Sequence, residues 1–108
     1  MMNLPKVVAD LVTAQNQFDS LAYADCFSET AVVFDEGKTH TGRKAIQKWI
    51  DESNKKYKSV MKPVSITHQG ITSVLSAECS GTFPGSPLIL KFHFDINNGL
   101  IEALKVTG

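Results

Sequence analysis

Apolar side chains recur at helical spacing through the first half of the chain. Between residues 5 and 18 they return every three or four positions, and Pro5 suits the first turn of a helix, where no N–H is needed. A second, short helical stripe ends near Ser28, and a third covers 43–57 with Thr41 as its candidate N-cap. The pattern therefore predicts three helices in this half of the chain.

The remaining segments have the alternating apolar and polar positions that are typical of strands. Residues 31–35 and 38–40 indicate two short strands on either side of a turn. Four longer segments, rich in β-branched and aromatic residues, follow at 60–68, 71–83, 87–96 and 100–106. Because the turns between them are short, we expect an antiparallel meander, and helices followed by strands indicate an α+β domain.

Alternation also assigns the two faces of the strand at 87–96. One face consists of apolar side chains that we expect to pack against the helices, namely Leu88, Leu90, Phe92, Phe94 and Ile96. The opposite face is more polar and carries Ile89, Lys91 and His93. We expect this outer face either to be exposed or to meet a second subunit.

Composition and charge narrow the class of protein. The chain has 108 residues, which suits one domain covering 1–108. It contains 11 basic and 11 acidic residues, so no basic excess points to nucleic acid. No segment is apolar enough to span a membrane and the N-terminus lacks the pattern of a secretory signal, so the cytoplasm is the expected compartment. Cys26 and Cys79 lie far apart and are expected to be buried thiols.

Two stretches of the sequence, together with the order of the predicted elements, resemble a known family. Residues 26–33, CFSETAVV, are similar to one of its motifs, and Gly42, Ala45, Ile46 and Trp49 are spaced as in another. The family is the nuclear transport factor 2-like superfamily. The similarity is greatest to its SnoaL-like members, which include polyketide cyclases and ketosteroid isomerases, and it covers nearly the whole chain.

The resemblance implies a cystatin-like cone roll, in which three N-terminal helices pack on a curved, mostly antiparallel sheet and enclose a pocket. Members of the superfamily commonly form dimers through the outer sheet face, which here carries Ile89, Lys91 and His93. They include isomerases, cyclases, dehydratases, transport adaptors and proteins without known activity. The fold alone therefore constrains the function poorly.

Asp35 is the sharpest candidate for chemistry. Its place at the end of the strand 31–35 is similar to that of the general base in ketosteroid isomerases. An apolar pocket would raise the pKa of this carboxyl toward a useful range, because burial disfavours the charged form. The alternative is that the carboxylate accepts backbone N–H groups of the Glu36-Gly37 turn.

The resemblance to ketosteroid isomerases breaks at the two groups that would stabilise an enolate oxygen. An ungapped count from Asp35 places Leu11 at the position of the tyrosine donor, and the late strand places Leu90 at the position of the second donor. Each missing donor removes about 3 kcal/mol or more of barrier lowering. Steroid isomerisation by that mechanism is therefore not expected, and Leu11 and Leu90 become candidates for the apolar lining of the pocket.

Further candidates for the pocket come from the third helix and from the strands. Trp49 and Tyr57 lie on the inner face of that helix, while Phe83 and Phe92 belong to inward strand faces. We expect Trp49, Phe83 and Phe92 to contact a ligand and Tyr57 to offer a hydroxyl. Core packing with a satisfied polar tip is the alternative for these aromatic residues.

His68 shares the parity of the inward-facing residues near the end of its strand. It would form an acid–base pair with Asp35 if the fold brought the two together, and a structural role is the alternative. No two histidines have the helical spacing of metal ligands, so we predict no metal, and no motif indicates another cofactor.

Three functional hypotheses follow from these residues. The first is a homodimeric protein that binds a small, largely apolar organic molecule in its pocket. The second is an isomerase, cyclase or dehydratase that uses Asp35 as a base, with His68 or Tyr57 assisting. The third is an interaction module whose pocket is filled by its own side chains.

Overall fold

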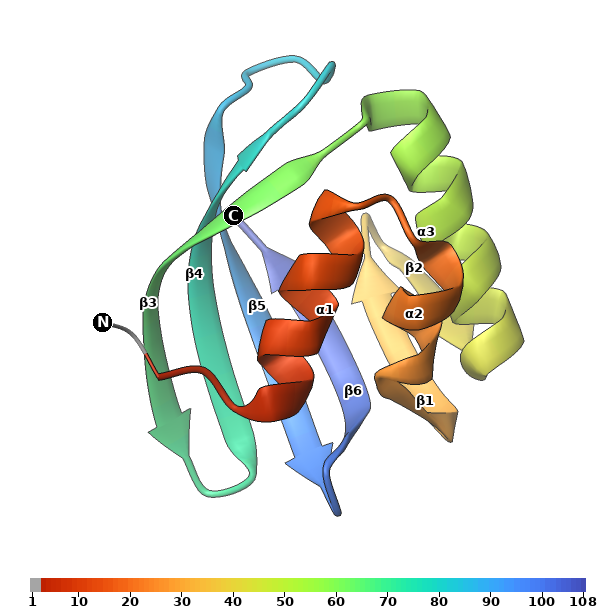
Figure 1. Ribbon diagram of the computed structural model, residues 1–108, viewed down its shortest axis with the longest axis vertical. Coiled ribbons are helices and arrows are strands. Elements are labelled where there is room, and N and C mark those ends of the chain that lie inside the picture. The colour runs from red at the N-terminus through yellow and green to blue at the C-terminus, as the bar shows by residue number, and fades with distance from the viewer. Residues whose placement is uncertain (1–2) are drawn as a thin grey trace.

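The computed structural model describes residues 3–108 and places three helices over one side of a single sheet (Figure 1). Residues 1 and 2, with which the predicted domain begins, lie outside the described residues. The helices are α1 (Lys6–Asn16), α2 (Ser20–Asp25) and α3 (Arg43–Tyr57). The strands are β1 (Phe27–Asp35), β2 (Lys38–Thr41), β3 (Val60–Gln69), β4 (Thr72–Ser80), β5 (Leu88–Asn97) and β6 (Leu100–Thr107).

The sheet has six strands in the order β2-β1-β6-β5-β4-β3. The predicted meander is confirmed, because β3, β4, β5 and β6 pair in sequence and antiparallel. The first strand of the chain returns to the last, and β1 pairs parallel to β6. This long-range pairing places the end of β1 next to the last strand, and it confirms a mostly antiparallel α+β architecture.

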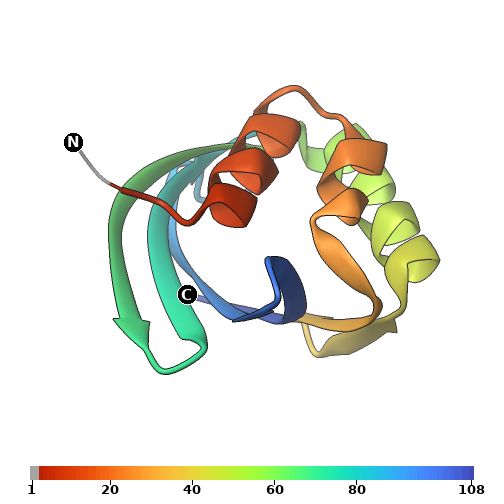
Figure 2. The same ribbon diagram turned by 60° about the horizontal axis from the view of Figure 1, so that its bottom comes forward.

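The sheet is curved, and the helices close the concave side (Figure 2). Register irregularities interrupt β1 beside β6, β3 beside β4 and β5 beside β6, and such bulges bend strands. The core lies between the helices and the inner sheet face. Its largest side chains with 0% exposure are Leu11, Phe27, Ile46, Leu75, Phe94, Ile101 and Leu104.

Two side chains at the end of α1 attach this helix to its neighbours. The Asn16 amide donates to the Met61 carbonyl at 3.0 Å and accepts from the Met61 N–H at 2.8 Å. The buried Gln15 amide donates to Asn54 Oδ1 at 2.9 Å and to the Ser59 carbonyl at 2.6 Å. These bonds hold α1, α3 and the start of β3 together at one end of the sheet.

The helices begin and end differently from the sequence pattern at three positions. The first helix ends at Asn16, because Phe18 takes φ 54° in the left-handed region. The second ends at Asp25, and Phe27 is already the first residue of β1. Thr41 does not cap α3, because it is the last residue of β2 and pairs with Val32 of β1. The N-cap of α3 is Gly42.

The apolar face of β5 also divides differently from the prediction. Phe92 and Phe94 are buried in the core as expected, but Leu88 is 42% exposed and Leu90 is half-buried. β4 ends at Ser80 instead of continuing to Phe83, since the chain turns toward the end of α3. The connection between β4 and β5 therefore leaves the sheet and contacts the helical layer.

Candidate functional site

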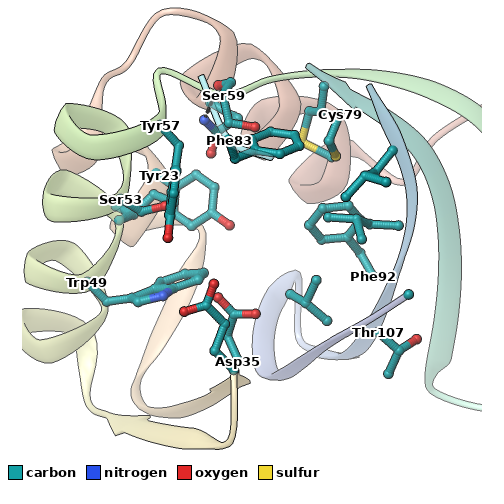
Figure 3. Close-up of a pocket in the computed structure, with 18 of the residues that line it drawn as sticks. Tyr23, Asp35, Trp49, Ser53, Tyr57, Ser59, Cys79, Phe83, Phe92 and Thr107 are labelled. Carbon is teal, nitrogen blue, oxygen red and sulfur yellow. Dashed lines mark hydrogen bonds between the residues drawn. The ribbon is translucent and has the colours of Figure 1, made fainter. Parts of the chain in front are cut away.

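A cavity of about 470 Å³ opens between α3, the β4–β5 connection and the inner sheet face (Figure 3). Most of its lining is apolar or aromatic, and few polar groups reach it. This combination of a concave, mostly apolar surface with a few polar groups is typical of small-molecule sites. Side chains do not fill the cone.

The structure brings six of the residues predicted from sequence to this one cavity. They come from β1, α3, the β4–β5 connection and β5, and they are Asp35, Trp49, Tyr57, Phe83, Leu90 and Phe92. Trp49 and Tyr57 extend from the same face of α3, Phe83 lies next to Tyr57, and Phe92 lies on the far wall (Figure 3). All six residues line the same cavity, but this position alone does not assign a role to any of them.

Leu11 does not line the cavity, and the expectation that it does is wrong. It has 0% exposure and belongs to the hydrophobic core under α1. The residue of α1 that reaches the cavity is Gln15, one helical turn farther along, because the cavity lies beyond the C-terminal end of this helix.

His68 is also absent from the cavity, so the predicted pair with Asp35 does not form. Its side chain is exposed, and its Nδ1 makes a 2.8 Å hydrogen bond with Ser73 Oγ. Ser73, which lies opposite His68, is six positions along β4 from Cys79 at the cavity, and six residues of strand span roughly 20 Å. Parity predicted the face correctly, but the cavity lies at the other end of the strand.

Asp35 ends β1 half-buried, with its carboxylate directed toward Trp49 in the cavity (Figure 3). Burial and the neighbouring Glu36 carboxylate raise the pKa of this carboxyl above its ordinary value. Hydrogen bonding from the Trp49 side chain, the nearby His40 and the Glu36 backbone N–H oppose the rise. The two interpretations of Asp35 therefore describe one geometry, in which the side chain both accepts from the turn and lines the cavity.

Tyr23 on α2 is a lining residue that the sequence analysis missed. It is only 2% exposed, yet its hydroxyl points into the cavity near Asp35 and Trp49 (Figure 3). No side-chain polar atom that is fully buried in residues 3–108 lacks a hydrogen-bond partner, so the Tyr23 hydroxyl is a polar group of the cavity surface. Burial, followed by the Asp35 carboxylate, raises its pKa strongly, so the hydroxyl keeps its proton.

The helix that carries Tyr23 is too short for its inner face to be read from periodicity. α2 has six residues, and the short apolar stripe that was predicted to end near Ser28 includes Leu21 and Ala24. In the structure Leu21 is 58% exposed and Tyr23 is buried. A bulky aromatic residue in a one-and-a-half-turn helix was the only available signal.

The aromatic side chains around the carboxylate end contact one another. The rings of Tyr23 and Trp49 meet edge-on with centroids 6.1 Å apart. His40 from β2 stacks on Trp49 at 5.5 Å and is not part of the lining. Tyr23 also contacts Phe27 at 5.7 Å. Packing on several sides fixes the orientation of these rings before any ligand binds.

The cavity has an acidic end and no opposing base. Asp35 and Glu36 line it, whereas none of the described lining residues is lysine, arginine or histidine. The Gln15 amide nitrogen is already engaged by Asn54 and Ser59. The charge that the described side chains present to a ligand is therefore negative.

The β4–β5 connection forms the opposite rim of the cavity. Thr82 N–H donates to the Tyr57 carbonyl at 2.7 Å, and Thr82 Oγ1 donates to the same carbonyl at 3.1 Å. A Cβ on Gly81 would lie 2.5 Å from the Tyr57 carbonyl oxygen, so only glycine fits this approach. The connection is thereby fixed on α3, and Phe83 meets Tyr57 edge-on at 6.1 Å.

Cys79 lines the cavity as a thiol, and Cys26 lies elsewhere in the core. Both cysteines are buried, as the sequence predicts. Burial raises the pKa of the Cys79 thiol to about 11, so it presents a neutral, weakly polar surface.

Within residues 3–108, no three histidine, cysteine, aspartate or glutamate side chains converge on a point where they could hold a metal ion. None of the helices described there has the length and apolar character of a membrane span.

Comparison with known proteins identifies similar structures. No family model matches the chain, and no curated protein sequence matches it. A candidate polyketide cyclase from Sinorhizobium meliloti is 36% identical over 96% of this chain and 95% of its own, with a TM-score of 0.92. A protein with a ketosteroid isomerase-like fold from Catenulispora acidiphila, in complex with trimethylamine, is 17% identical over 98% and 87%, with a TM-score of 0.87. A cystatin-fold protein from Novosphingobium aromaticivorans is 12% identical over 100% and 99%, with a TM-score of 0.80.

Proposed function

Because the chain belongs to the nuclear transport factor 2-like superfamily, in its SnoaL-like branch, we propose that it binds a small, largely apolar organic molecule in the cavity of its cone. The observation that carries this proposal is the cavity of about 470 Å³, into which five aromatic side chains converge. Preformed apolar cavities of this size are the usual sites of small ligands. The trimethylamine bound to the Catenulispora protein supports a search among small organic molecules.

Trp49 makes ligand binding directly observable, since it is the only tryptophan of the chain and lines the cavity. A library of small apolar molecules would be titrated while Trp49 fluorescence is recorded. Leu90→Phe fills part of the cavity and should weaken binding about ten-fold or more. Ile89→Phe adds the same group at the neighbouring position on the outer face and should leave binding unchanged. Equal affinities of the two variants would contradict binding in the cavity.

A second candidate function is acid–base catalysis, which the convergence of Asp35 and Tyr23 on one cavity favours. In such a reaction the Asp35 carboxylate would take a proton from the carbon beside a carbonyl, and the electron pair would move to the carbonyl oxygen. The Tyr23 hydroxyl would donate a hydrogen bond to that oxygen, the role that Leu11 and Leu90 cannot perform. The reaction class is that of isomerases, cyclases and dehydratases.

Proton exchange separates catalysis from binding. A ketone that binds the cavity would be incubated with the protein in D₂O, and deuterium incorporation beside the carbonyl would be followed by NMR. Asp35→Asn should reduce the exchange rate to that of the free ketone, while Tyr23→Phe should reduce it by about 10²-fold. Exchange that Asp35→Asn leaves unchanged would exclude Asp35 as the base.

The assembly that we propose is a homodimer formed through the outer sheet face. Ile89 on this face is 51% exposed, Lys91 is exposed, and His93 bonds to Thr107 of the adjacent strand. A single domain and a cytoplasmic location remain predictions from the sequence. The hypothesis of an interaction module with a filled pocket is not retained, because the cavity is open.

A further inference from the structure

We propose that the ligand of this cavity is an amphipathic organic cation. Its ammonium head would lie among Asp35, Glu36 and Trp49, and its apolar part would extend toward Phe83. The inference rests on the proposed binding function and names the chemical class of the ligand. It is carried by the charges, the aromatic rings and the Tyr23 hydroxyl at one end of the cavity.

The negative charge at one end of the cavity favours a cationic ligand. Asp35 and Glu36 line the cavity, and neither has a salt bridge within residues 3–108, where the recorded ion pairs are Lys6–Asp10 and Lys55–Asp51. An anionic ligand would meet two carboxylates and no described basic side chain. A cation would supply the missing partner for a half-buried carboxylate, and such a pair is strongest where water is partly excluded.

The aromatic surface next to these carboxylates also favours a cation. Trp49 is the ring type that attracts cations most strongly, because the face of its π-system is negative, and an ammonium group binds within about 6 Å of such a ring. Tyr23 stands edge-on to Trp49, so two rings border the acidic end. Aromatic rings beside carboxylates recognise alkylated ammonium groups, which have little hydration to lose.

The Tyr23 hydroxyl adds a polar group at the same end of the cavity. The side chain is only 2% exposed, and its hydroxyl is aimed into the cavity (Figure 3). The hydroxyl oxygen can accept a hydrogen bond from a protonated amine. A few polar groups on an apolar cavity wall orient the ligand that binds there.

The rest of the cavity sets the shape of the ligand. Away from the carboxylates, the wall is formed by apolar side chains such as Met61, Phe83, Leu88, Phe92 and Val106. A compact inorganic cation or a highly polar polyamine would leave this surface without a contact. An amine or quaternary ammonium ion with one aromatic or branched apolar group fits both ends.

The electrostatics of Asp35 predict how binding depends on pH. Burial and Glu36 raise the pKa of its carboxyl, and a bound cation would lower it again. The charged and titratable groups around it are Glu36, Tyr23 from α2, His40 from β2 and the exposed, cross-strand Lys38. Affinity for a permanent cation should therefore fall as pH drops and Asp35 takes up its proton.

The test compares two ligands of the same shape that differ in charge. Benzyltrimethylammonium carries a permanent positive charge, and neopentylbenzene is its neutral isostere with carbon in place of nitrogen. Both would be titrated at pH 7.5, with Trp49 fluorescence and NMR shifts of the backbone amides as readouts. We expect the cation to bind at least ten-fold more tightly than the isostere.

Two variants separate the role of charge from general effects. Asp35→Asn keeps the shape of the side chain and should reduce cation affinity about ten-fold without changing the affinity for neopentylbenzene. Glu52→Gln removes an exposed carboxylate on the outer face of α3 and should change neither affinity. NMR shifts that are confined to the backbone amides of cavity residues would show that the cation binds in the cavity.

Each contrary result has a distinct meaning. If neopentylbenzene binds as tightly as the cation and Leu90→Phe blocks it, the cavity binds apolar ligands and the cation inference is overturned. A loss of cation binding in Glu52→Gln equal to that in Asp35→Asn would also overturn it. If neither probe nor any member of the apolar library perturbs Trp49, both this inference and the proposed binding function fail.

Discussion

Asp35 is a half-buried carboxylate to which the described fold gives no ionic partner. Its pKa is raised because burial disfavours the charge and Glu36 adds repulsion, while bonds from Trp49 and the turn offset only part of this effect. A fold selected for stability alone would favour a neutral side chain at this position. This carboxylate therefore marks a place where stability and function conflict.

The effect of the Asp35 charge on stability can be measured as the pH dependence of the free energy of unfolding. Below the ordinary pKa of 3.8, both folded and unfolded chains hold the Asp35 proton, so this group does not affect stability. As pH rises through 3.8 and then the raised folded value, ionisation favours the unfolded chain and the free energy of unfolding falls. Asp35→Asn should therefore raise Tm at pH 7 but not at pH 3. Thermal unfolding followed by circular dichroism tests this, and a lower Tm of the variant at pH 7 would contradict it.

The burial of the two cysteines predicts low thiol reactivity in the folded protein. Burial raises the pKa of both thiols to about 11, so little reactive thiolate is present at pH 8. We expect almost no reaction with a disulfide reagent in the native protein and reaction of both Cys26 and Cys79 in denaturant. Absorbance of the released thiolate measures this directly. Rapid labelling of either residue in the folded chain would show that the core opens easily.

At the scale of elements, the cavity depends on how the β4–β5 connection is attached to α3. Thr82 bonds to the last carbonyl groups of the helix, and Gly81 lets the two backbones approach. At the same end of α3, Gln15 and Asn54 join α1 to α3 through buried amides, and Gln15 also bonds to Ser59 beside Gly81. The rim and the wall are therefore parts of one hydrogen-bonded framework.

Gly81→Ala should disturb this framework. Its Cβ would meet the Tyr57 carbonyl at 2.5 Å, so the connection must move, which we expect to destabilise the fold by about 1–3 kcal/mol. It should also weaken ligand binding by moving Phe83. Gly99→Ala is the control, because its Cβ meets no atom within 4 Å and only its φ of 77° is unfavourable, at about 1 kcal/mol. Urea unfolding and Trp49 titrations would compare them, and unchanged binding in Gly81→Ala would show that the rim tolerates displacement.

At the scale of the whole molecule, the two faces of the sheet have separate roles. The inner face forms the core and the cavity, while the outer face carries exposed apolar groups, among them Ile89 and Phe34 at 51% and 44%. Apolar groups exposed on a continuous sheet face suit an interface between identical subunits. The cavity and the proposed dimer interface thus use opposite sides of β5.

Light scattering after size exclusion would test the dimer. We expect a dimeric mass for the wild-type chain and a monomeric mass for Ile89→Lys, since a lysine would be desolvated at the interface. The new lysine lies opposite Glu78, which keeps the monomer itself stable. Leu21→Lys changes an exposed apolar residue on α2, away from the outer sheet face, and should remain dimeric. A monomeric wild-type chain at micromolar concentration would refute the proposed assembly.

The amino-acid sequence by itself determined the three helices, the strands and the inward residues Phe92 and Phe94 of the strand at 87–96. These are local properties, since apolar spacing and turn residues act over a few positions. They were sufficient to place Trp49 and Phe92 on inward faces, while Asp35 became a candidate through the resemblance to the family. The order of motifs also identified the fold, which the comparisons confirm.

Only the tertiary structure decided where the cavity lies along those inward faces. Leu11 and His68 face inward but belong to the core and to the distant end of β3, whereas Gln15 and Tyr23 reach the cavity. The difference arises because β1 pairs with β6 and the β4–β5 connection bonds to α3. Such contacts join residues far apart in sequence, and no local pattern records them.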